Sequence, residues 1–128
     1  MKRLLLVLGV AALLSMHGAL VGQEHHHPDP DVQLGTVSFP ISCTAPEQMK
    51  FERGVALLHS FWYEEAEKHF KQIEQDDPGC AMAYWGEAMS LYHGLWNRPS
   101  ESDLKRGWQL VQKAKAAGAK TDRERLYL

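Results

Sequence analysis

A nine-residue segment that recurs 34 positions later, from residue 54 to residue 88, constrains the fold of this chain more than any other feature. Residues 54–62 read GVALLHSFW and residues 88–96 read AMSLYHGLW. The two segments agree in size or chemistry at each position, and the motif H-x-x-W recurs unchanged. A period of this length with helix-end signals around it indicates helix-turn-helix repeats.

Local capping signals mark the ends of the expected helices along residues 44–128. A hydroxyl or carboxylate at a helix start bonds the free N–H groups of the first turn, and glycine favours the conformation that ends a helix. Starts are expected at Thr44 with Glu47, at Asp77 followed by Pro78, at Ser100 with Asp103 and at Thr121 with Glu124; stops are expected at Gly94 and Gly118.

These residues resemble the tetratricopeptide repeat (TPR) family. The family has a small residue at position 8 of the repeat, Ala at 20, a large apolar residue at 24 and Pro at 32. A first repeat counted from Glu47 puts Gly54, Ala66, Phe70 and Pro78 at those positions. The resemblance implies an all-α fold of antiparallel helix pairs stacked as a TPR-like solenoid, with about two repeats plus the start of a third.

The second repeat, counted from Ala81, follows the family pattern less closely, and its second helix fits only with four residues inserted near residues 97–100. We expect a TPR-like helical repeat domain over residues 44–128, truncated at its C-terminus. The second-repeat residues that match the TPR pattern are Tyr84, Ala88, Leu91, Leu104, Trp108 and Val111.

The chain also resembles a group of exported bacterial proteins with such repeats and no settled function.

The N-terminus has the pattern of a secretory signal peptide over residues 1–22. Lys2 and Arg3 precede an apolar run, Leu4 to Leu14, which is followed by small and neutral residues. The run is too short for an ordinary membrane span. The pattern predicts a periplasmic or secreted protein; an uncleaved anchor over residues 4–22 is the alternative.

Residues 23–43 are expected to form a flexible linker, because two prolines and several acidic residues interrupt its first part. Val37 to Ile41 is a short extended stretch limited by Pro40. The adjacent His25, His26 and His27 have incidental affinity for metal ions, but an unordered tract fixes no coordination geometry.

The charge balance excludes two classes of partner. Lys and Arg total 14 against 16 for Asp and Glu, which gives a net charge of −2. Removal of residues 1–22 takes two basic residues and no acidic ones, so 12 against 16 remain, a net charge of −4. We therefore expect neither nucleic-acid binding nor stable membrane association after cleavage.

The first helices of the two repeats are expected to line a concave, apolar groove that binds a peptide or protein partner. The alternative is that the same residues are core, covered by a preceding segment or by a further part of the chain. The TPR resemblance implies that the candidate partner-binding residues are those at the groove-facing positions of the family: Phe51, Val55, Leu58, His59, Trp85, Met89, Tyr92 and His93.

A metal- or redox-linked protein is the alternative function. His59 and His93 occupy equivalent positions of the two repeats, but no Cys or carboxylate is an obvious third ligand, so no metal site or cofactor is predicted. No catalytic motif is present either. Glu64, Glu65 and Glu67 are expected to form a solvated helix face, and the remaining alternative is the N-terminal part of a larger enzyme or assembly factor.

The two cysteines, Cys43 and Cys80, stand near the starts of the first helices of both repeats. The TPR resemblance implies that these helices run parallel, which brings the two thiols to one end of the stack. We expect a disulfide in an oxidising compartment. A reactive Cys80 thiolate near a helix N-terminus is the alternative.

Overall fold

The computed structural model describes residues 33–93, 95 and 97–128. The predicted signal peptide, the histidine tract and the expected stop at Gly94 lie outside these residues. None of the described helices has the length and apolarity that crossing a membrane requires. The helices are α1 (Ala45–His59), α2 (Tyr63–Asp76), α3 (Ala81–Tyr92), α4 (Glu101–Ala117) and the short α5 (Asp122–Arg125).

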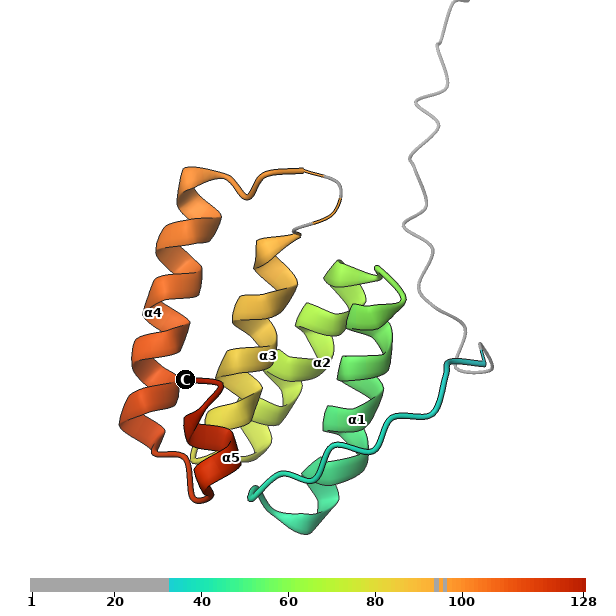
Figure 1. Ribbon diagram of the computed structural model, residues 1–128, viewed down its shortest axis with the longest axis vertical. Coiled ribbons are helices and arrows are strands. Elements are labelled where there is room, and N and C mark those ends of the chain that lie inside the picture. The colour runs from blue at the N-terminus through green and yellow to red at the C-terminus, as the bar shows by residue number, and fades with distance from the viewer. Residues whose placement is uncertain (1–32, 94, 96) are drawn as a thin grey trace, which may run out of the picture.

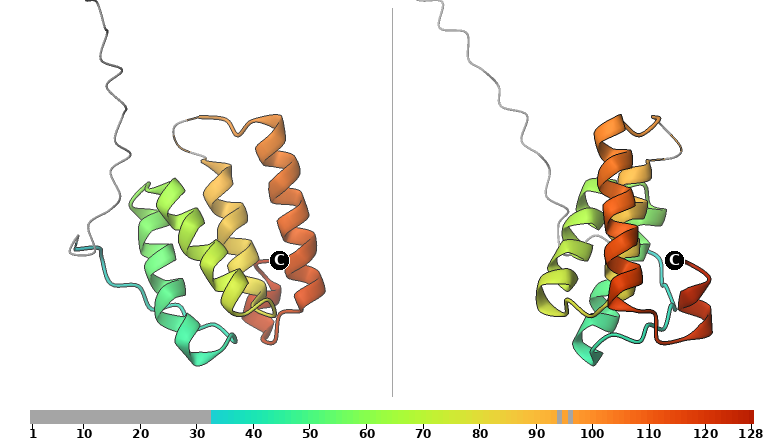
Figure 2. Two further views of the ribbon diagram at one scale, coloured as in Figure 1. Left: turned by 180° about the vertical axis from the view of Figure 1, so that it is seen from behind. Right: turned by 90° about the vertical axis from the view of Figure 1, so that its left-hand side faces the viewer.

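The described residues form an all-helical fold, as the sequence predicts. Helices α1 to α4 run alternately up and down and lie side by side (Figure 1). Helix α1 packs on α2, α2 on α3 and α3 on α4, and α1 also contacts α3. Helix α5 lies at the lower end of the array, on the same side as the extended segment that precedes α1 (Figure 2).

Phe70 of α2 is the centre of this packing. Its ring is fully buried between α1 and α3, because both helices have a glycine facing it. A Cβ atom at Gly54 would lie 2.8 Å from the ring, and one at Gly86 would overlap it. The glycines therefore let three helix backbones approach one aromatic side chain, and Ala66 beside it is also fully buried.

Two of the predicted capping boxes form in full. The Ser100 hydroxyl accepts the N–H of Asp103 at the start of α4, and Thr121 does the same for Glu124 at α5. Gly118 ends α4 with a φ of 82°, as expected. Thr44 precedes α1, but its side chain makes no capping bond.

The predicted helix start at Asp77 and Pro78 is wrong. Asp77 caps the C-terminus of α2, and α3 begins at Ala81 after Cys80. The Asp77 carboxylate accepts the N–H of Gly79 at 3.1 Å and that of Thr44 at 2.9 Å. It therefore holds the turn between α2 and α3 and ties it to the residue that precedes α1, so it is not available to cap α3.

The expected disulfide is present between Cys43 and Cys80, whose Cα atoms are 4.9 Å apart. Cys80 is fully buried at the start of α3, and Cys43 directly precedes the cap of α1. The bond therefore joins the two helix starts next to the Asp77 turn.

Candidate binding surface

The structure divides the eight predicted groove residues by depth. Phe51 and Val55 are core residues, so for them the alternative of core packing holds. Met89 and Tyr92 of α3 are exposed, at 39% and 56% of their surface. Leu58, Trp85 and His93 are half-buried, and His59 is exposed.

An extended segment of the chain itself covers the buried part of this face. The predicted flexible linker therefore needs correction over residues 34–43. Its apolar side chains pack on the core cluster of α1, α2 and α3, and the disulfide fixes its end. The packed residues are Leu34, Val37, Phe39, Ile41 and Cys43.

Phe39 is the principal side chain of this segment. Its ring centroid lies 5.4 Å from that of Phe51 and 6.0 Å from that of Trp85, whose ring it stacks on. Tyr127 closes the cluster, 5.3 Å from Phe39 and 5.2 Å from Trp85. Two candidate groove residues thus form the floor of a pocket that one aromatic side chain fills.

Two polar side chains of α1 hold the backbone of the segment. The Gln48 amide donates from Nε2 to the Phe39 carbonyl at 2.9 Å, and its Oε1 accepts the N–H of Ile41 at 2.9 Å. Glu52 accepts the N–H of Phe39 at 3.1 Å. Gln48 and Glu52 are one helical turn apart, so both face the segment. Sequence reasoning missed them, although the alternation of Val37, Phe39 and Ile41 signals an extended peptide with one apolar side.

Helix α5 holds the segment from the other side. Buried Glu124 accepts the N–H of Ser42 at 2.7 Å and its hydroxyl at 2.5 Å. Burial acts to raise the pKa of Glu124, but the Ser42, Thr121 and Lys120 donors outweigh it and the pKa is lowered from its ordinary value. The Arg123 guanidinium lies 4.6 Å from the Phe39 ring centroid and donates to the Pro40 carbonyl.

A second aromatic cluster lies at the opposite end of the helices, where α1 meets α2 and α3 ends. A cavity of about 320 Å³ opens there beside Trp62, Tyr63 and His93. His93 stacks on Tyr63 with a centroid distance of 5.0 Å. His93 caps α3 in the left-handed region at φ 44°.

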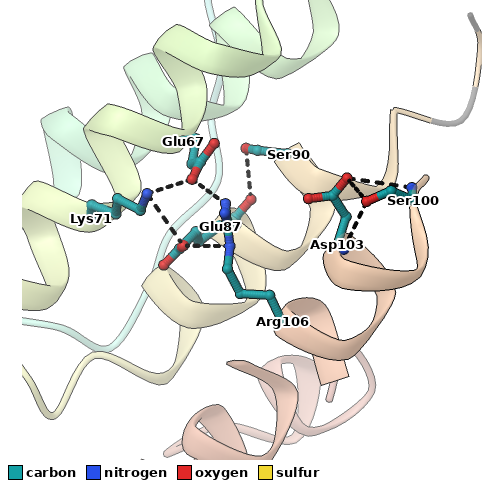
Figure 3. A network of polar contacts seen from close by, with 8 residues as sticks. Glu67, Lys71, Glu87, Ser90, Ser100, Asp103 and Arg106 are labelled. Atoms are coloured by element: carbon teal, nitrogen blue, oxygen red, sulfur yellow. Dashed lines mark hydrogen bonds and ion pairs between the residues drawn. The ribbon is translucent and has the colours of Figure 1, made fainter. Parts of the chain in front are cut away.

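A network of charged side chains joins α2, α3 and α4 (Figure 3). Glu67 pairs with Lys71 and with Arg106, and both cations lie 3.8 Å from the buried carboxylate of Glu87. The expected solvated face therefore needs correction at Glu67, which links α2 to α4. Sequence reasoning missed this because Arg106 reaches it from a distant helix.

Glu74 borders the same network in a cavity of about 380 Å³. Burial, followed by the neighbouring Glu87 carboxyl, raises the pKa of Glu74 to about 8.

Comparisons with protein-family models, with curated proteins and with solved structures found no match to this chain. Among the described residues, no group of three or more His, Cys, Asp or Glu side chains is arranged to hold a metal ion.

Proposed function

We propose that this chain is an exported, non-catalytic protein-interaction module built from TPR-like helix pairs, and that its α1/α3 face binds an extended apolar peptide. Two features support the TPR-like arrangement. Helices α1 to α4 alternate in direction, and Phe70 packs between Gly54 and Gly86, at the boundary of the two repeats.

The observation that carries the binding proposal is the way in which residues 37–41 occupy the face. Val37, Phe39 and Ile41 pack toward the helices, while Ser38 and Pro40 are exposed. Gln48 bonds the backbone on both sides of Pro40. Backbone bonds combined with pockets for alternate side chains are how proteins recognise extended peptides.

The occupant we propose is a partner segment with large apolar residues at alternate positions and an aromatic residue in the centre. Such a segment competes with residues 37–41 for Gln48 and for the Phe51/Trp85 floor. Exposed Met89 and Tyr92 extend the same helix face beyond the resident segment and provide additional contact area.

Export is supported by the Cys43–Cys80 disulfide, because disulfides persist in oxidising compartments. The charged and then apolar N-terminal pattern supports it as well.

Peptide binding in trans tests the proposal. A labelled peptide with the sequence of residues 36–42, TVSFPIS, is titrated into the Phe39→Ala chain by fluorescence anisotropy. Loss of the anchor frees the aromatic pocket, so we expect this variant to bind the peptide at least about tenfold more tightly than the parent chain. A peptide with Ala at the Phe position is expected not to bind.

Two further variants make the result specific. Adding Gln48→Ala to Phe39→Ala removes the backbone contacts and should abolish binding, whereas adding Met49→Ala, which alters a side chain 76% exposed on the same helix, should leave it unchanged. The proposal fails if the Phe39→Ala chain keeps its helical circular dichroism and does not bind the peptide.

A further inference from the structure

Helix α4 presents an uncovered apolar stripe. Leu104 and Trp108 are 54% and 65% exposed, and Val111 is half-buried, whereas Leu110 and Ala114 on the other side of the helix are buried. The right-hand view of Figure 2 shows α4 in front, with no other described helix over it. Trp108 corresponds in the repeat alignment to Phe70, which is fully buried. The described fold therefore leaves the second repeat without the cover that the first repeat has.

Opposite charges stand at the two ends of this stripe. Glu101 and Lys115 are each seven positions from Trp108, about two helical turns, so both lie on its face. Neither forms an ion pair with another described residue. An antiparallel copy centred on Trp108 places Glu101 opposite Lys115 of the partner subunit, and Leu104 close to Val111 of the partner subunit. The stripe is thus complementary to itself under a two-fold axis.

Gly107 allows the close approach that such a pair requires. A Cβ atom at this position would meet nothing within 4 Å, so space is open beside Trp108. The indole can pack near this backbone as Phe70 packs on Gly54 and Gly86. A helix dipole also favours an antiparallel neighbour.

We propose that two copies of this chain associate through α4 in an antiparallel, two-fold symmetric dimer centred on Trp108. The interface is a single helix face, at the small end of specific interfaces, so we expect a reversible dimer with a Kd of about 10–100 µM. This association is independent of the peptide face on α1 and α3.

Sedimentation equilibrium of the disulfide-bonded chain without residues 1–22, over a concentration range that brackets this Kd, tests the proposal. Trp108→Glu is expected to remain monomeric, and because the side chain is exposed the variant should keep its circular dichroism. Met49→Ala, on exposed α1 surface, should dimerise as the parent does.

Charge reversal tests the register. Glu101→Lys and Lys115→Glu each place like charges opposite one another, so each should weaken the dimer by about threefold to tenfold. The double variant Glu101→Lys/Lys115→Glu restores both pairs and should recover the parent Kd. The proposal is overturned if the parent chain stays monomeric over the whole concentration range, or if the double variant dimerises as weakly as the single variants. A monomeric parent chain would indicate that the α4 stripe binds a helix of another protein.

Discussion

The ring of Phe70 lies in the space that a side chain at Gly86 would occupy. This contact between α2 and α3 explains why the interior of a helix has a glycine there, despite its low helix propensity. It also fixes how closely α2 and α3 approach one another.

Gly86→Ala is expected to destabilise the chain by about 1–3 kcal/mol, because the added methyl group overpacks a rigid buried ring. Gly107→Ala is the matched control, since its Cβ meets nothing within 4 Å in the interior of α4. That substitution should stabilise the folded chain by up to about 1 kcal/mol, because alanine has a higher helix propensity than glycine. Urea unfolding of both variants, at protein concentrations well below the dimer Kd, measures the two changes in the free energy of unfolding. Equal changes in the two variants would contradict the proposed role of Phe70.

Replacing both cysteines by alanine, as Cys43→Ala/Cys80→Ala, should lower the free energy of unfolding by about 3–4 kcal/mol. The bond closes a loop with a sequence separation of 37, which restricts the unfolded chain. Unfolding with and without dithiothreitol is the measurement. The reductant should weaken the parent chain and leave the variant unchanged; a parent chain insensitive to complete reduction would contradict the prediction.

Ser100→Ala should lower the free energy of unfolding by about 1 kcal/mol, because the Ser100 hydroxyl caps α4. Thr44→Ala is the control, since the Thr44 side chain makes no capping bond and its bonds come from the backbone, whose N–H donates to Asp77 and whose carbonyl accepts from Glu47. Thermal unfolding should therefore show a lower melting temperature for Ser100→Ala than for Thr44→Ala, although the sequences at the two helix starts look alike. A larger loss at Thr44 would show that the cap assignments are reversed.

Stability is expected to fall as pH rises through the titration of Glu74. Its folded pKa of about 8 lies above its ordinary value of 4.5, so the folded chain retains a proton that the unfolded chain releases. This contribution is complete below pH 4.5 and is lost as the pH passes 8.

Glu74→Gln imitates the protonated carboxyl and should raise the melting temperature at high pH with little effect in acid. Glu64→Gln, an exposed residue of the same helix, serves as the control. Melting curves across this pH range give the comparison. A Glu74→Gln advantage that is the same at every pH would rule out titration of this group as its cause.

The helices and most of their ends could be predicted from the sequence, because capping boxes and glycine stops act within a few residues. Ser100, Thr121 and Gly118 behave as their local sequence indicates. Asp77 does not, because its carboxylate accepts the backbone N–H of Thr44, the residue that precedes α1. Capping patterns consider only residues close in the sequence, so they do not predict a bond to a residue 33 positions away.

The candidate site was less predictable for the same reason. The TPR resemblance implied that Phe51 and Trp85 share one face, but it did not indicate that Phe39 packs on both of them. Likewise, the sequence around Glu67 is typical of an exposed helix face, and only the tertiary structure shows that Arg106 of α4 pairs with it.

The sequence by itself indicated the all-helical fold, the small residues Gly54 and Ala66 near Phe70 and the pairing of the two cysteines, since each depends on spacing along the chain or on the implied repeat. Only the tertiary structure decided which apolar face is closed and which is open. The segment around Phe39 fills the α1/α3 face, while Trp108 on α4 is left 65% exposed by the described residues. Burial of one helix face depends on which distant segment arrives to cover it, and periodicity alone does not identify that segment.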